Sequence, residues 1–285
     1  MSPAPRAPRR PLRLALAGAA LLLAATPLLA HDLFLVPDRF RVEAGRPIRV
    51  ALVNGTFALA ENVVERERVR AIRVAAADTA IDVAPTAWSE SGETTFVHLP
   101  APPAGTIALG VSLHPATIAL AGEDFDAYLV EEGLDEARGD RERRGVAADS
   151  ARERYAKHAK AVLRVGGGGG EGWGAILGFQ AELVPLSDPT ALAPGDTLRV
   201  RAMSGGLPAV GVALRAGWRA ARGGAQRIAP VRTDSTGVAA IPIAAAGRWY
   251  VKTIDLRRST EAGLDYESEW ATLTFEVAGP ATRGR

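Results

Sequence analysis

Short apolar segments rich in Val and Ile, separated by Pro and Gly, occupy most of the chain between residues 31 and 115. Segments of this length and composition are typical of β-strands, and their spacing favours antiparallel pairing over a parallel α/β sheet. The expected strands are Leu33–Val36, Arg39–Val42, Ile48–Val53, Val69–Val74, Thr94–Leu99 and Thr106–Leu113. We therefore predict an N-terminal β-sandwich over residues 31–120.

A helical pattern begins after residue 120. Phe125, Tyr128 and Leu129 have helical spacing, with acidic residues before them and Gly133 as a stop signal after them. The charged segment Asp135 to Arg144 that follows is interpreted as a loop.

A second helix is expected to begin at Ser150, because Ser150 and Glu153 have the spacing of a capping box. Tyr155, Ala159 and Val162 would then share its buried face. The sequence thus predicts a helical insertion over residues 121–165, packed on the first sandwich through Tyr128, Leu129, Tyr155 and Val162.

Residues 166–178 are rich in glycine and are interpreted as a loop, because no Lys-Ser or Lys-Thr pair follows them as in a phosphate-binding loop. Strand-like segments separated by turn signals resume from Phe179. They are Leu198–Arg201, Val212–Ala216, Val238–Ile243, Trp249–Ile254 and Ala271–Val277. The prediction is a second sandwich over residues 179–285, and a fold class that is mainly β.

The composition, 47% hydrophobic and 23% charged, is that of a globular protein and excludes a disordered or polytopic membrane chain. Four of the 34 Lys and Arg residues lie in the first 30 positions, which contain no Asp or Glu. Removing those four leaves 30 basic against 32 acidic residues, a net charge of −2. No nucleic-acid partner is therefore expected.

The first 30 residues have the features of a secretory signal peptide: an Arg-rich start, the apolar run Leu14 to Ala25, and a possible cleavage position after Ala30. A membrane anchor is the alternative, but the run is short for a bilayer span and Pro27 interrupts it. Cleavage would leave His31 as the N-terminus. We expect a periplasmic or secreted protein with no membrane span after processing, and the absence of cysteine excludes disulfides and thiolate metal ligands.

Several ordered motifs give the chain a resemblance to a known family. The motifs are His31-Asp32-Leu33-Phe34-Leu35-Val36-Pro37, Phe125-x-x-Tyr128-Leu129, Glu131-Glu132-Gly133-Leu134, Arg152-Glu153-Arg154-Tyr155, Leu183-Val184-Pro185, Asp188-Pro189, Pro194-Gly195-Asp196 and Glu267-Ser268-Glu269-Trp270. Together they resemble the NikM-like periplasmic proteins, a family of unknown function labelled as an accessory to nickel or cobalt uptake. The segment after Leu207 also resembles prealbumin-like or carboxypeptidase-regulatory-like modules. Asp255 stands where the NikM-like family often has a histidine, which weakens a metal site built from imidazoles.

His31 is the first candidate metal ligand. As a mature N-terminus it would offer an amine and an imidazole that chelate one ion, a donor pair suited to Cu, Ni or Zn. The alternative is an ordinary histidine at the start of an edge strand.

Three carboxylates are the candidate partners of His31. Alternation along the last strand places Glu267 and Glu269 on its core side, where they would bind a cation, pair with Arg257 or Arg258, or reach water. With Asp255, they complete the predicted metal site of His31, Asp255, Glu267 and Glu269 at the interface of the two sandwiches.

The remaining histidines, His98, His114 and His158, show no His-x-His or His-Glu-x-x-His spacing, and His158 is expected to face solvent. No Gly-x-Ser-x-Gly motif occurs, so the protein is not expected to be an enzyme, although spacing alone leaves catalysis by serine or by a carboxylate pair open.

The leading hypothesis is an exported protein that binds a transition-metal ion (Ni, Co, Cu or Zn), or helps to deliver one to an uptake transporter or outer-membrane receptor. The alternative is a non-catalytic β-sandwich module that binds a protein or polysaccharide.

Overall fold

The computed structural model describes residues 31–76, 79–167, 169–220 and 224–279. The predicted signal peptide lies outside these residues. The fold is mainly β, as predicted, with three sheets built largely of antiparallel pairs. None of the helices within the described ranges is long and apolar enough to cross a bilayer.

A five-stranded sheet has the order β1-β3-β8-β7, with β4 paired to β3. Its strands are β1 (Asp32–Pro37), β3 (Ile48–Thr56), β4 (Leu59–Asn62), β7 (Ala87–Ser91) and β8 (Thr94–Leu99). A four-stranded sheet comprises β12 (Ala181–Pro185), β13 (Thr197–Ser204), β14 (Leu207–Pro208) and β18 (Val238–Pro242). The predicted strands of both sheets are present, whereas β4, β7, β12 and β14 are additions.

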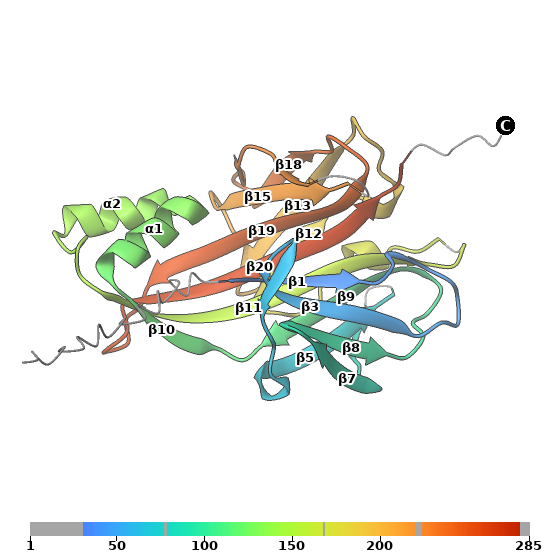
Figure 1. Cartoon of the computed structure of the whole chain (residues 1–285). Helices are drawn as coiled ribbons and strands as arrows, with labels where there is room; N and C mark the ends of the chain where they lie inside the picture. Colours follow the sequence, from blue (N-terminus) through green and yellow to red (C-terminus); the bar gives the residue numbers. More distant parts are fainter. Residues whose placement is uncertain (1–30, 77–78, 168, 221–223, 280–285) are drawn as a thin grey trace, which may run out of the picture.

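An eleven-stranded sheet lies between them, with the order β16-β15-β19-β20-β11-β9-β5-β6 and with β2, β10 and β17 paired at its sides. Its main strands are β5 (Val69–Ala75), β6 (Ala80–Asp82), β9 (Gly105–Leu113), β11 (Ala151–Val165), β15 (Ala213–Arg219), β16 (Ala225–Arg227), β19 (Gly247–Arg258) and β20 (Tyr266–Val277). The short ones are β2 (Arg41–Val42), β10 (Ala116–Leu120) and β17 (Val231–Arg232). Figure 1 shows β11, β19 and β20 running through the middle of the molecule.

The predicted second helix is wrong, because residues 151–165 form the long strand β11. This strand pairs in parallel with β20 and antiparallel with β9, and most of its residues are buried. A strand buried on both faces has no polar alternation to identify it, and its Ala, Arg, Glu and Lys residues favour helix in isolation. Tertiary pairing overrides that preference, and the long sheet joins strands from both halves of the chain.

The first predicted helix is confirmed as α1 (Gly122–Glu132), which ends at Gly133 with φ of 67°. A left-handed residue at this position is the usual reason for glycine at a helix end. The segment interpreted as a charged loop is instead a second helix, α2 (Asp135–Arg143). Both helices lie beside the same end of β19 and β20 (Figure 1).

Helix α1 was predicted to pack on the first sandwich, and it packs both on Leu120 of β10 and on strands β19 and β20 from the second half of the chain. Phe125 lies 5.0 Å from the ring centroid of Tyr266, and Tyr128 stacks on Trp270 at 5.8 Å with the ring planes 4° apart. Leu129 and Ile254 belong to the same buried cluster. The predicted packing relied on a second helix beside α1. Because residues 151–165 form strand β11 instead, that helix does not exist.

The central sheet separates two larger hydrophobic clusters. One contains Leu35, Val50 and Leu163, and lies between the long sheet and the five-stranded sheet. The other contains Val200, Trp249 and Leu273, and lies against the four-stranded sheet. Along β11, Leu163 points into the first cluster and Val162 into the second, as expected for a strand that is buried on both faces.

Candidate functional site

A cleft of about 360 Å³ lies where β1, β4, the end of α1, β15 and β19 meet. The residues that line it are His31, Asp32, Phe34, Gly55, Thr56, Phe57, Glu61, Glu131, Glu132, Arg215, Ala216, Arg227, Ile228, Tyr250 and Lys252. They come from both halves of the chain, and they include four carboxylates. We call this cavity the His31 cleft.

His31 is held by two neighbours on β4. Its Nε2 lies 2.5 Å from Oε2 of Glu61, and its Nδ1 lies 3.0 Å from Nδ2 of Asn62. When the Asn62 amide donates to Nδ1, the ring proton is on Nε2 and is donated to Glu61. The imidazole is thus oriented toward a carboxylate at the mouth of the cleft.

A second charged group of the cleft centres on Lys252 of β19. Its Nζ lies 2.6 Å from Oδ2 of Asp32 and 2.8 Å from Oε1 of Glu132. Burial alone would lower the pKa of Lys252, but the two carboxylates outweigh burial and raise it. Burial raises the pKa of Glu132, against the opposing effect of Lys252. One ammonium therefore bridges the N-terminal strand and helix α1.

Three aromatic rings form an apolar wall of the cleft. The ring centroid of Phe34 is 5.3 Å from those of both Phe57 and Tyr250, and Phe57 and Tyr250 are 4.9 Å apart. Burial raises the pKa of the Tyr250 hydroxyl. The cleft therefore combines an aromatic wall with charged groups of both signs, which suits a small polar or cationic ligand.

The three carboxylates predicted as partners of His31 lie elsewhere. Asp255 accepts a hydrogen bond from Ser204 at 2.5 Å. Glu267 pairs at 2.5 Å with Arg154, and not with Arg257 or Arg258 as the sequence favoured. Glu269 pairs at 2.8 Å with His158.

Alternation along β19 explains this separation. Lys252 points into the His31 cleft, so Asp255, three residues further on, points to the other face of the sheet. Cross-strand pairing with Asp255 places Glu269 on that same face, and Glu267 follows two residues away. The structure therefore does not bring His31 together with the other three predicted ligands.

Among the described residues, no group of three or more His, Asp or Glu side chains is arranged to hold a metal ion. Two donors do meet in the cleft, the His31 imidazole and the Glu61 carboxylate. Glu61 had no distinguishing signal in the sequence, because β4 was not predicted. An α-amine on His31 would be a third donor, and with it the set would suit Cu, Ni or Zn.

His158 is buried, contrary to the expectation that it faces solvent. Its Nδ1 lies 3.0 Å from Oγ of Ser112, and its ring stacks on Phe179 with centroids 5.8 Å apart. The error follows from the helix predicted over β11, since a helical register placed His158 on the polar side. Identifying β11 as a buried central strand would have predicted the burial of His158.

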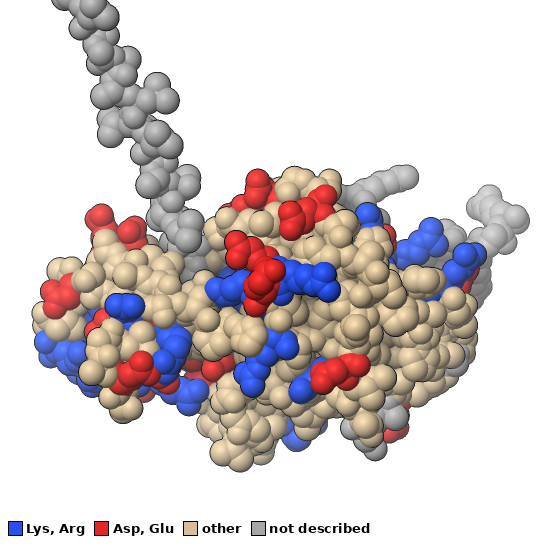
Figure 2. Space-filling model, turned by 90° about the horizontal axis from the view of Figure 1, so that it is seen from below, with Lys and Arg blue, Asp and Glu red and all other residues tan. Residues whose placement is uncertain are grey.

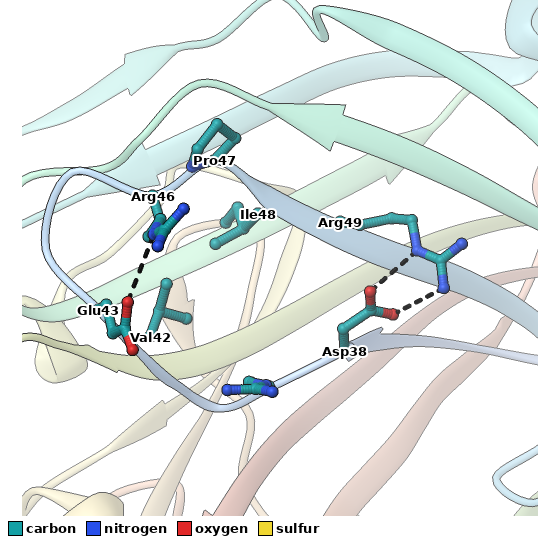
Figure 3. Close-up of a pocket in the computed structure, with 8 residues that line it drawn as sticks. Asp38, Val42, Glu43, Arg46, Pro47, Ile48 and Arg49 are labelled. Carbon is teal, nitrogen blue, oxygen red and sulfur yellow. Dashed lines mark hydrogen bonds and ion pairs between the residues drawn. The ribbon is translucent and has the colours of Figure 1, made fainter.

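A larger cavity, about 410 Å³, lies at the turn between β2 and β3 (Figure 3). Its side chains already pair with one another, Arg49 with Asp38 at 2.9 Å and Arg46 with Glu43 at 3.3 Å, and all four are substantially exposed. Exposed pairs of this kind are weak and common on surfaces. This cavity therefore offers less specific chemistry than the His31 cleft.

Figure 2 shows acidic and basic side chains interspersed over one face of the molecule, with no broad patch of a single sign. A nucleic-acid surface would require a continuous basic patch.

The fold places the chain among mainly-β proteins, and comparison of sequences then identifies its family. Residues 28–255 match the family described as Domain of unknown function (DUF4198). The match covers most of the chain, and the protein belongs to this family. The resemblance to families of unknown function is thereby upheld, while the nickel and cobalt association is not part of that description.

Comparison with curated proteins finds no match. Two solved structures are similar over most of the chain: a tetra-tandem repeat in the extending region of a large adhesion protein, at 9% identity and a TM-score of 0.22, and the Escherichia coli adhesin FdeC, at 14% and 0.22. The alignments cover 86% and 88% of this chain, but 49% and 64% of those structures. At these TM-scores the likeness carries no argument about function.

Proposed function

We propose that the protein is exported and binds a transition-metal ion as cargo in the His31 cleft, for transfer to an uptake transporter or receptor. The observation that supports this proposal best is the contact of the His31 imidazole with the Glu61 carboxylate in a cleft that contains three further carboxylates. Imidazole and carboxylate are both common metal ligands, and the His31 α-amine would complete a chelate if processing occurs after Ala30.

In the structure, the proton on Nε2 of His31 is donated to the Glu61 carboxylate. A bound metal ion would take the place of this proton between the two side chains. Two donors bound to one tetrahedral metal lie about 3.4 Å apart, given metal–donor distances of about 2.1 Å. The His31 and Glu61 atoms, at 2.5 Å, need to separate by less than about 1 Å. Because β4 is a short strand, a movement of this size is compatible with the fold.

Proton competition gives the proposed site a defined pH dependence. A protonated imidazole has no lone pair for a metal, so protons compete with the metal ion and binding should weaken as the pH is lowered. Binding rather than catalysis is proposed here, since Asp32 and Glu132 are both paired with Lys252 instead of presenting a free acid and a free base.

The test is calorimetric titration of Cu(II), Ni(II), Co(II) and Zn(II) into protein beginning at His31, with metal content measured after dialysis. We expect His31→Ala and Glu61→Gln each to weaken binding at least tenfold, and an extra N-terminal residue to do the same. His98→Ala is the matched control, because His98 contacts the Ser89 hydroxyl and no carboxylate. Equal binding by all of these proteins would refute the proposal.

An interaction module is the second candidate, and strand β7 is the observation in its favour. It forms the end of the five-stranded sheet, and four of its five residues are exposed. A sheet end of this kind can accept an extended segment of a partner protein. Glu90→Pro, which removes one backbone donor, should then abolish capture of a partner's peptide without changing metal binding at His31.

A further inference from the structure

Three polar residues form a hydrogen-bonded row across the central sheet, on the face opposite the His31 cleft. They are Ser112 on β9, His158 on β11 and Glu269 on β20. Oγ of Ser112 lies 3.0 Å from Nδ1 of His158, and Nε2 of His158 lies 2.8 Å from Oε2 of Glu269. We propose that this row is a catalytic triad that activates Ser112 as a nucleophile toward small carboxylic esters.

Strand register produces the row. Counting on from the antiparallel pair Val162–Ala108 brings His158 opposite Ser112. On the other side, His158 pairs with Ala271 of the parallel strand β20, and Glu269 lies two residues earlier on the same face. Rigid neighbouring strands thus hold all three side chains, which favours precise positioning over a contact between mobile loops.

The order of proton donors is the one that a triad requires. An ionised Glu269 accepts the Nε2 proton of His158, which leaves Nδ1 as the acceptor of the Ser112 hydroxyl proton. Phe179 stacks on the imidazole with ring planes 24° apart and fixes its orientation. The nitrogen atoms are used in the reverse of the familiar serine-protease assignment, but the roles of base and orienting carboxylate are the same.

A cavity gives Ser112 a space in which a substrate can lie. Its volume is about 300 Å³, and Ser112, Phe179, Ile176 and Met203 are among the residues that line it. Arg70 lines the same cavity and gives it a positively charged group. The volume and mixed lining fit an ester of a small carboxylic acid.

The proposed reaction balances without a cofactor. Oγ of Ser112 attacks the ester carbonyl carbon as its proton passes to Nδ1 of His158, and Glu269 stabilises the imidazolium. The bond to the alcohol oxygen then breaks, His158 returns the proton to that oxygen, and an acyl-serine remains. Water attacks the acyl group with His158 again taking the proton, which releases the carboxylic acid and restores Ser112.

This site is separate from the His31 cleft, so either proposal can fail alone. Incubation of the folded protein with a fluorophosphonate probe, followed by intact mass and peptide mapping, tests it directly. We expect one adduct on Ser112, absent in Ser112→Ala and formed at least tenfold more slowly in Glu269→Gln and His158→Gln. p-Nitrophenyl acetate should give a burst of p-nitrophenolate with the wild type only.

Ser89→Ala is the matched control, because Ser89 lies 3.3 Å from a ring nitrogen of His98 but that pair contacts no carboxylate. It should leave labelling unchanged. A wild-type protein that forms no adduct, or one that Ser112→Ala does not abolish, would overturn the proposal. The absence of an adduct on the wild type refutes the proposal whether or not the variants fold. Circular dichroism spectra of the variants show which of them are folded.

Discussion

Two lysines three residues apart on β11 are buried on opposite faces of the central sheet. Lys160 lies 2.7 Å from Oε2 of Glu182 and 3.1 Å from the carbonyl oxygen of Ala175. Lys157 has a neutral partner, Oδ1 of Asn54 at 2.9 Å, and lies over the ring of Trp270. One interior thus pairs the buried ammonium directly with a carboxylate. In the other, the ammonium contacts a neutral amide and an aromatic face, while Asp32 and Glu153 act on it only at longer range.

Burial lowers the pKa of both lysines, but nearby groups oppose this effect differently at the two positions. Burial lowers the pKa of Lys157 to about 8, while that of Lys160 is lowered by burial against the opposing effect of Glu182. The chain contains one other lysine, Lys252, which has two carboxylate partners and a raised pKa. Of these three buried lysines, only Lys252, which has two carboxylate partners, has a raised pKa.

The largest effect is expected when the matched interior loses its carboxylate. Glu182→Gln leaves the Lys160 ammonium buried without a counter-charge and weakens acceptance of the Leu177 and Phe179 N–H groups. Breaking a buried pair in this way costs roughly 3–5 kcal/mol. Urea denaturation at pH 7 measures it, and a loss below about 1 kcal/mol would show that the pair is not energetically coupled.

The unmatched interior should respond to pH instead. Because the folded pKa of Lys157 is about 8 and the ordinary value is 10.5, the unfolded chain binds more protons between these values. Stability therefore rises with pH from about 8 toward 10.5 through this group. Relative to Lys157→Met, the wild type should gain about 2 kcal/mol between pH 7 and pH 9.5. Parallel stability curves for the two proteins would contradict this.

Lys252 provides an intermediate case, because removing one of its two carboxylates leaves the other. Glu132→Gln keeps Asp32 at 2.6 Å from the ammonium and also removes a buried carboxylate whose pKa is raised. We expect a loss of about 1 kcal/mol in the free energy of unfolding, the net contribution of a typical hydrogen bond, because the cost of burying the Glu132 carboxylate is removed together with the contact. If Glu132→Gln lowered the free energy of unfolding as much as Glu182→Gln does, a second carboxylate partner would give Lys252 no protection against loss of the first.

The exposed pair of Asp38 and Arg49 sets the lower limit of the comparison. Both side chains are about half exposed, at 50% and 45%, although their nitrogen and oxygen atoms are 2.9 Å apart. Asp38→Asn should cost less than about 1 kcal/mol and should cost less still in high salt. Thermal denaturation with and without 1 M NaCl measures this, and a salt-independent loss would argue for a role beyond charge.

The sequence predicted most of the strands because their Val and Ile residues lie between clear turn signals. Thr94–Leu99 agrees with β8 at both ends, and helix α1 ends at the predicted Gly133. The failure at β11 has a physical cause: Ser150, Glu153 and Tyr155 satisfy helical rules locally, whereas the pairing that makes a strand comes from residues more than a hundred positions away. Local patterns do not contain that information.

Site prediction failed for a related reason. Alternation correctly placed Glu269 on an inward face of β20, but the identity of the opposing residues depends on β11. His31 was identified from the sequence, whereas its contact Glu61 lies on a four-residue strand with no distinct pattern. Single residues were therefore predictable as candidates, and their partners were not.

The hydroxyls of β20 have a consequence for the order of folding. Thr272 and Thr274 donate at 2.6 Å to the carbonyl oxygens of Leu33 and Leu35, which are 239 positions earlier in the chain. Contacts between such distant segments form slowly, because closing a long loop costs entropy before the contact is gained. The contacts of β1 and β11 with β20 therefore form only after the last strand of the described chain has been made, and a nascent or truncated chain without β20 leaves those sides of β1 and β11 uncovered.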